Sequence, residues 1–218
     1  VESIYIIDDG KGMSYDDLVK KWLFVAYSAK QDGTEDLNKS HTYAGNKGVG
    51  RFSCDRVGGK LRLQAKSEND SIVHVLDVDW GDFEQDSKEK FEQITVQYST
   101  QDNFIVSATA MKSKSCGVVL EMYDLRSPSS WDRTKLLRLK RHLAKLINPF
   151  GDTSSSINLN LFCEREEEKD KSLLLSNSSD PSQESSKTVN GSVDNKIFDI
   201  LKQKTTWLNV SLDINGQF

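Results

Sequence analysis

Two short glycine-rich stretches in this sequence, DDGKGM and GNKGVG, have residue types and spacing suited to binding a ligand. In the first, Asp8 follows the apolar run SIYII, and a carboxylate at the end of a buried strand is costly to desolvate unless it accepts hydrogen bonds. A ligand amine is one such donor. Gly10 and Gly12 lack a Cβ, so the backbone can adopt unusual angles and let a flat ring approach closely. Met13 would add a soft apolar wall.

The second stretch, from Gly45 to Gly50, suits phosphate oxygens. Its glycines free successive backbone N–H groups at the start of an expected helix, and Lys47 adds a positive charge beside them. Each stretch alone has an ordinary alternative: an Asp-Gly turn between a strand and a helix for the first, and a tight loop-to-helix turn for the second. Both together, in this order and separated by a polar loop, indicate a nucleotide site far more specifically than either one alone.

The elements that must position the first stretch are a strand before it and a helix after it. Residues 3–7 form a short β-rich run that ends at the Asp-Asp-Gly turn. Ser14 is then a helix N-cap candidate with Asp17 three residues later. Apolar residues follow at helical spacing; they are Leu18, Trp22 and Val25.

The second stretch lies between a long polar loop and a run of strands. Residues 30–46 have no apolar period and the length of a lid. A helix is expected to open near Gly48 and to continue through GRFSCDRVG. Four mostly antiparallel strands are expected in KLRLQAK, SIVHVLDVDW, EQITVQYS and CGVVLEMYDL, and a fifth in INLNLF. Residues 131–147 return to a helical pattern, whose apolar stripe is Leu136, Leu139, Leu143 and Leu146.

Composition limits the classes of protein to consider. The 218 residues are 36% hydrophobic, enough for a core, and the net charge of −4 gives no global reason to expect nucleic-acid or membrane binding. Cys54, Cys116 and Cys163 are far apart and form no CxxC pair, which argues against a disulfide framework or a zinc ribbon and favours the cytoplasm. No apolar run is long enough to span a membrane. Because the chain starts at Val1 and enters a strand directly, we expect residues to precede it.

In combination, the two stretches resemble the glycine boxes of the GHKL superfamily, the ATP-binding domain shared by DNA gyrase B subunits, ninety-kilodalton heat-shock chaperones, histidine kinases and MutL proteins. DDGKGM resembles the D-x-G-x-G box, which implies that Asp8 holds the adenine amino group. GNKGVGRFS resembles the second box, which implies phosphate binding under a lid. The closer likeness is to bacterial ATP-binding proteins with a G-x-K-G-x-G-R-F box. The resemblance implies ATP and Mg²⁺ as cofactors and these nucleotide-binding residues: Asp8, Gly10, Gly12, Met13, Gly45, Asn46, Lys47, Gly48, Val49, Gly50, Arg51 and Phe52.

The resemblance also implies the architecture. It predicts an α+β Bergerat-type two-layer sandwich, with helices on one face of a mixed, mainly antiparallel sheet. We expect a GHKL-like domain over residues 1–163, an acidic and serine-rich linker or disordered insertion over residues 164–194, and the start of a following element over residues 195–218. ATP and the remainder of a larger multidomain chain are the expected partners, and a homodimer is left open.

Two departures from the family pattern stand out. Val118 occupies a position at which many relatives have a threonine near phosphate. The family's first box, a helix with a glutamate that orients water and an asparagine four residues later that holds magnesium, is missing, because no asparagine here has Glu or Asp four residues before it. We therefore assign no catalytic residue and no metal ligand. We expect ATP hydrolysis, coupled to a conformational change, only when an upstream helix is present.

Several alternatives stay open beside this interpretation. GTEDLNKS is a near miss to a P-loop, but Asn38 replaces the second glycine and the flanking elements are wrong. A nucleotide-gated scaffold would bind ATP without turnover. The histidines His41, His74 and His142 are not at metal-ligand spacing, which favours structural roles.

The helix at residues 131–147 allows a nucleic-acid-binding module, since it carries Arg133, Lys135, Arg138, Lys140, Arg141 and Lys145. A solvated charged face explains these cations as well, and no interleaved aromatic residue supports base stacking. The acidic run Glu166–Glu168 is interpreted as solvated linker.

Overall fold

The structure is a computed structural model that describes residues 2–23, 50–81, 96–106, 115–147, 157–176 and 187–194. The chain divides into two compact units, Val1–Ser130 (unit 1) and Trp131–Phe218 (unit 2). Unit 1 thus ends before residue 163, where we placed the end of the first domain. In the described residues, no helix is long and apolar enough to cross a membrane.

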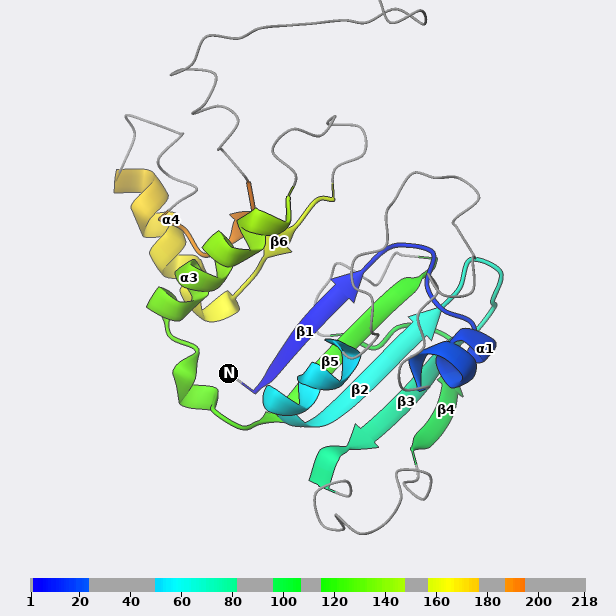
Figure 1. Cartoon of the computed structure of the whole chain (residues 1–218). Coiled ribbons are helices and arrows are strands. Elements are labelled where there is room, and N and C mark those ends of the chain that lie inside the picture. The colour runs from blue at the N-terminus through cyan, green and yellow to red at the C-terminus, as the bar shows by residue number, and fades with distance from the viewer. Residues whose placement is uncertain are drawn as a thin grey trace, which may run out of the picture. The chain divides into compact units, whose positions relative to one another are not determined.

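Unit 1 is built on a five-stranded sheet in the order β1-β5-β2-β3-β4 (Figure 1). Every pairing between its described strands is antiparallel. The strands are β1 (Ser3–Asp8), β2 (Gly58–Lys66), β3 (Val73–Asp79), β4 (Gln97–Gln101) and β5 (Gly117–Leu125). Each overlaps a stretch that was predicted to form a strand, which confirms the α+β class and the mainly antiparallel sheet.

Short helices cover one face of this sheet. They are α1 (Tyr15–Asp17), which continues as the π-helix η1 (Leu18–Trp22), and the 3₁₀ helix η2 (Gly50–Arg56). Leu18, Trp22 and Cys54 from these helices form one core cluster with Leu61 and Leu63 of β2. Figure 1 shows α1 and the cyan turn of η2 in front of the sheet. The expected arrangement, helices on one face, is therefore confirmed for unit 1.

The start of α1 follows the predicted capping box. The Ser14 hydroxyl accepts from the Asp17 backbone N–H at 3.2 Å, and the Asp17 carboxylate accepts from the Ser14 backbone N–H at 3.1 Å. Burial acts to raise the pKa of Asp17, but hydrogen bonds from Lys21 and Ser14 outweigh it and lower that pKa. The carboxylate therefore stays ionised at neutral pH and holds the first turn directly after the first glycine stretch.

The opposite face of the sheet has a second, smaller core around Val73, Val75 and Val119. Gln64, fully buried in β2, ties the segment at residues 104–106 to the sheet through both of its amide atoms. Its Nε2 donates to the Ile105 carbonyl and its Oε1 accepts from the Ile105 N–H, each at 2.7 Å. Phe104 and Val106 on either side join the second core.

The described residues of unit 2 form two α-helices, two short 3₁₀ helices and a two-stranded ribbon. Its described elements are α3 (Arg133–Leu143), η6 (Ala144–Leu146), β6 (Asn160–Leu161), η7 (Glu164–Glu166), α4 (Glu167–Ser176) and β7 (Gly191–Ser192). Asp132 caps α3 by accepting from the Lys135 N–H at 2.8 Å. Of the predicted leucine stripe, Leu136 is buried while Leu146 at the far end is exposed.

The prediction of a solvated linker from residue 164 is wrong for the described residues of that segment. Glu166 is 2% exposed and Asp170 is 4% exposed. The Arg133 guanidinium binds both carboxylates, at 3.0 Å and 2.6 Å. The Arg133 cation compensates the charge of both acids, and the Val189 and Asn190 backbone N–H groups add to this for Asp170. Residues 177–186 and 195–218 of the predicted linker and following element lie outside the described residues.

Candidate functional site

Asp8 is the last residue of β1 and lies opposite Val118 of β5 in the sheet register. Its Oδ1 accepts a hydrogen bond from the Gly10 N–H at 2.7 Å. Among the described residues no other hydrogen bond or ion pair involves Asp8, so its Oδ2 is available as an acceptor. We expected this carboxylate to lie at the end of a buried strand, and that expectation is wrong. Asp8 is exposed, at the end of a strand on the sheet's edge.

The two glycines of this stretch have different structural surroundings. A Cβ on Gly10 would lie 2.8 Å from Asp8 Oδ1, so a side chain there would push the carboxylate out of its turn. Gly12 has a φ of +68°, and a Cβ on it would lie 1.8 Å from the Lys66 carbonyl oxygen at the end of β2. We attributed both glycines to an approaching base. For Gly12 the structure supplies a further cause, the close crossing of the loop over the sheet backbone.

An apolar surface continues from Asp8 along the same face of the sheet. Opposite residues of an antiparallel pair share a face, and so do alternate residues of one strand. Ile6 and its partner Leu120 therefore lie on the same face as Asp8 and Val118. Ile6 is 53% exposed, whereas Val118 and Met13 are half-buried against the helix-side core. The arrangement pairs a free carboxylate oxygen with an open apolar floor, which suits a flat ring that carries an amine.

Ile6 is a candidate site residue that our sequence analysis did not name. The signal was present in the alternation of the first strand, where Ile4, Ile6 and Asp8 are two residues apart and must share a face. What the pattern could not show is that Ile6 would stay exposed. That depends on β1 being an edge strand.

The second glycine stretch is outside the described residues for the most part. The predicted phosphate-binding residues Gly45, Asn46, Lys47, Gly48 and Val49 fall in residues 24–49, which the structure does not describe. Gly50, Arg51 and Phe52 begin η2, so the predicted helix after the glycines is present as a 3₁₀ helix. The phosphate site stays a prediction.

A magnesium site finds no support in the described part of the chain. No group of three or more His, Cys, Asp or Glu side chains there could hold a metal ion. His74 is buried, and its Nδ1 shares a hydrogen bond with the Tyr98 hydroxyl at 2.8 Å, a structural arrangement. The described residues alone do not supply a Mg²⁺ site, and we derive no chemical step through that ion.

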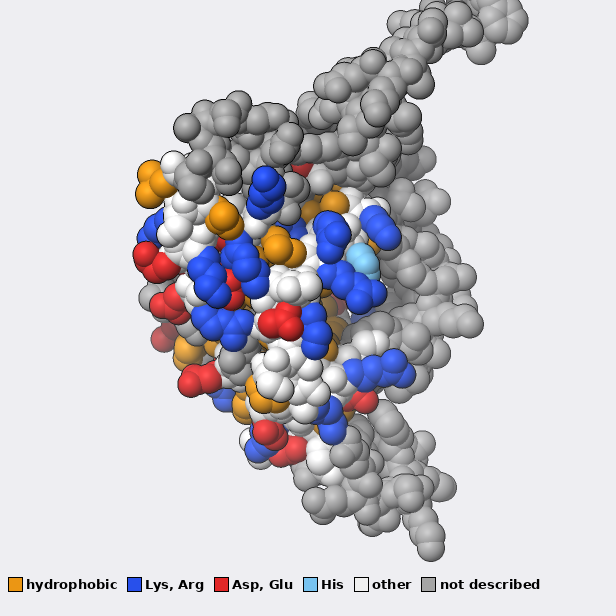
Figure 2. All heavy atoms as spheres, turned by 90° about the vertical axis from the view of Figure 1, so that its left-hand side faces the viewer, with side chains coloured by type: hydrophobic (Ala, Val, Ile, Leu, Met, Phe, Trp, Pro, Cys, Tyr) orange, Lys and Arg blue, Asp and Glu red, His pale blue; other side chains and the backbone are white. Residues whose placement is uncertain are grey.

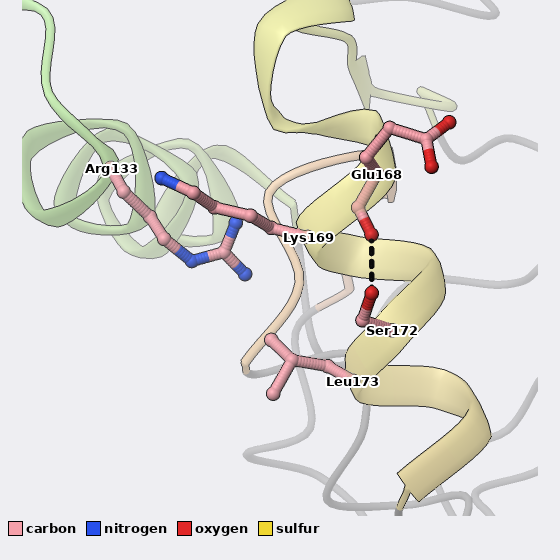
Figure 3. Close-up of a pocket in the computed structure, with 5 residues that line it drawn as sticks. All are labelled: Arg133, Glu168, Lys169, Ser172 and Leu173. Carbon is pink, nitrogen blue, oxygen red and sulfur yellow. Dashed lines mark hydrogen bonds between the residues drawn. The ribbon is translucent and has the colours of Figure 1, made fainter.

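A hollow of about 370 Å³ lies in unit 2 and is lined by Arg133, Glu168, Lys169, Ser172 and Leu173 (Figure 3). The Arg133 guanidinium is occupied by Glu166, Asp170 and the Lys187 carbonyl. In the close-up, the Ser172 hydroxyl donates to the backbone carbonyl of Glu168 at 2.9 Å. The hollow therefore offers few free polar groups to orient a ligand, and none of the predicted site residues lines it.

Comparison with known proteins gives a match over the first half of the chain. Residues 1–117 match a family model described as histidine kinase-, DNA gyrase B-, and HSP90-like ATPase. This match covers more than half of the 218 residues and includes both glycine stretches. A search of curated proteins finds no match.

Proposed function

Because the chain belongs to the histidine kinase-, DNA gyrase B- and HSP90-like ATPase family, an ATP-binding family, we propose that unit 1 binds ATP with the adenine amino group on Asp8 Oδ2. One observation carries this proposal. Asp8 has one oxygen fixed by the Gly10 N–H and the other available, next to the exposed side chain of Ile6. The fixed oxygen orients the carboxylate before any ligand arrives, which lowers the entropy cost of binding.

The phosphates are assigned to the second glycine stretch, from Gly45 to Gly50. The order of the two stretches, the length of the loop between them and the family match support this assignment. If the backbone N–H groups of this stretch lie at a helix start, as the sequence predicts, they and Lys47 would supply the donors that phosphate oxygens need. Residues 30–46, which the sequence predicts to form a lid, lie outside the described residues.

For a larger protein that also contains the missing upstream helix, we extend the proposal to Mg²⁺-dependent ATP hydrolysis that drives a conformational change. A nucleotide-gated scaffold without turnover is the second candidate. The observation in its favour is that no asparagine of this sequence has Glu or Asp four residues before it. Without a positioned base, bound ATP would act by its differential affinity for two conformations.

Replacement of Asp8 by asparagine tests the base pocket. Asp8→Asn keeps an oxygen that can accept from the Gly10 N–H but replaces the available oxygen with an NH₂ donor, which faces the adenine amine. The loss of a charge-assisted hydrogen bond costs about 1.5 to 3 kcal/mol, so ATP affinity measured by calorimetry should fall more than tenfold. Asp9→Asn has the same charge change and should bind ATP like the parent chain.

Inosine triphosphate sharpens this experiment, because its base has a carbonyl oxygen where adenine has the amine. The parent chain should bind it at least tenfold more weakly than ATP, and Asp8→Asn should abolish or reverse that preference. Equal ATP affinity of the parent chain and Asp8→Asn, with both folded by circular dichroism, would refute the assignment.

A further inference from the structure

The exposed side of α3 and η6 carries cations without a single acid. From Arg133 to Ile147 the sequence has no Asp or Glu. Of its six Lys and Arg residues, Arg133 is bound to Glu166 and Asp170, and Lys140 is buried with its ammonium on the Thr188 and Asn190 carbonyls. The other four are exposed and form what we call the basic stripe: Lys135, Arg138, Arg141 and Lys145.

The basic stripe follows from helical geometry. Its members are three or four residues apart, so they share one side of the helix, while Leu136 and Lys140 point to the other. No stripe residue forms an ion pair with any described residue. Figure 2 shows many blue Lys and Arg side chains, with several red Asp and Glu side chains among them.

These features differ from an ordinary solvated helix face. Such faces usually mix both signs of charge at spacings of three and four, as Asp16 with Lys20 and Glu167 with Lys171 do in this chain. Four unpaired like charges on one face repel each other at some cost in stability. The chain as a whole has a net charge of −4, yet these four cations lie on one face. That face is a local surface suited to an anionic partner.

Three anionic partners can be compared for this surface: a membrane, a single-stranded nucleic acid and a duplex. A basic helix that inserts into a membrane surface needs a free apolar face, but here Leu136 is buried, Leu139 and Leu143 are half-buried, and of the leucine stripe only Leu146 at the far end is exposed. No Phe, Tyr or Trp occurs between Asp132 and Ile147, so the side chains that stack best on unpaired bases are missing from this helix. A duplex, whose phosphates present regularly spaced negative charge and whose bases are already stacked, fits both observations.

We propose that the basic stripe binds the phosphate backbone of duplex nucleic acid without reading its sequence. From Lys135 to Lys145 the helix rises about 15 Å, a length over which a duplex carries roughly nine phosphate charges. Four cations therefore find partners in any register. This inference does not depend on ATP binding by unit 1.

The test uses the full chain and a short fluorescein-labelled DNA duplex of mixed sequence. Anisotropy at increasing salt should give a slope of log K against log salt of about −3 to −4, because each neutralised phosphate contributes about −0.9. Arg138→Gln/Arg141→Gln should halve that slope and weaken binding at least tenfold at low salt. Lys135→Gln/Lys145→Gln should do the same, which guards against a local effect of one pair.

The matched control is Lys20→Gln/Lys171→Gln. It has the same net charge as either stripe variant but removes cations that already pair with carboxylates. It should bind the duplex like the parent chain. An RNA duplex that binds similarly would support backbone recognition. Equal losses in stripe and control variants would overturn the proposal, as would tighter binding to a single strand or to phosphatidylserine vesicles than to either duplex.

Discussion

Gly10 and Gly12 are separated by one residue but lack a side chain for different physical reasons. At Gly10 the atom in the way is a carboxylate oxygen of Asp8, the mobile end of an exposed side chain. At Gly12 it is the Lys66 carbonyl of β2, and the φ of +68° is itself unfavourable for other residues. The first glycine therefore belongs to the proposed ligand site, whereas the second lets the loop lie against the sheet backbone.

Alanine at each position should separate these two roles. Gly12→Ala should lower the free energy of unfolding by about 2 kcal/mol or more, because the loop must lift from β2 and the residue is strained. Gly10→Ala should leave stability nearly unchanged but weaken ATP binding, since the methyl group displaces the Asp8 carboxylate. Urea unfolding and calorimetry measure the two effects. Similar stability of the two variants would contradict this distinction.

At the scale of elements, Asp170 joins α4 to the rest of unit 2. Its carboxylate accepts from Arg133 Nη2 at 2.6 Å, from the Val189 N–H at 3.2 Å, and from the Asn190 N–H and Nδ2 at 2.7 and 2.8 Å. Burial acts to raise its pKa, but these hydrogen bonds outweigh burial, so the pKa of Asp170 is lowered. The ionised form is thus the one that the fold stabilises.

The pH dependence of unit 2 follows from that lowered pKa. The unfolded chain takes up the proton first, at about pH 4, so the contribution of Asp170 to stability is present above that pH and is lost as pH falls through its folded pKa. Asp170→Asn should destabilise α3 and α4 at pH 7 by about 3 to 5 kcal/mol, and should flatten the loss below pH 4. Hydrogen exchange of the amides in Arg133–Leu143 and Glu167–Ser176 measures both.

Glu168→Gln is the control for this effect, since that side chain lies on the same helix but is almost fully exposed. Its exchange protection should match that of the parent chain at both pH values. If Asp170→Asn exchanged like Glu168→Gln, Asp170 would not contribute to the stability of these helices.

The same elements show how far the sequence was informative. Alternation in the strands, the Ser14 cap and the leucines of α3 are local signals, and they predicted elements of the correct type. The burial of Glu166 is not a local property, because its partner Arg133 is 33 residues away. Gln64 is another case, since its amide bonds to Ile105, 41 residues later. Such polar side chains look solvated until the pairing of distant segments is known.

At the scale of the whole molecule, the proposed nucleotide site and the basic stripe belong to different units. The family match ends at residue 117, the first residue of β5, so α3 and α4 lie beyond it. The nucleotide-site residues predicted from sequence all belong to unit 1, and the basic stripe belongs to unit 2. The helical pattern correctly predicted the charged helix, but it could not show which of its cations face solvent. Arg133 and Lys140 bind partners in the segment that we had interpreted as a linker.

ATP turnover is the property on which the whole chain should differ from its family. Hydrolysis needs a base within hydrogen-bond reach of a water molecule, and no Glu or Asp here occurs four residues before an asparagine. We expect residues 1–218 to bind ATP and release phosphate no faster than background, because the loss of a general base typically costs a factor of ~10² to 10⁴ in rate. Phosphate release with ATP and Mg²⁺, measured beside Asp8→Asn at the same concentration, tests this.

Release that is well above background and falls in Asp8→Asn would show that another residue serves as base, and Glu2 and Glu35 would be the first to replace. Release that is equal in both chains would come from a contaminant. Tight binding without release would identify the nucleotide-gated scaffold as the function of these residues, with ATP acting through its preference for one conformation.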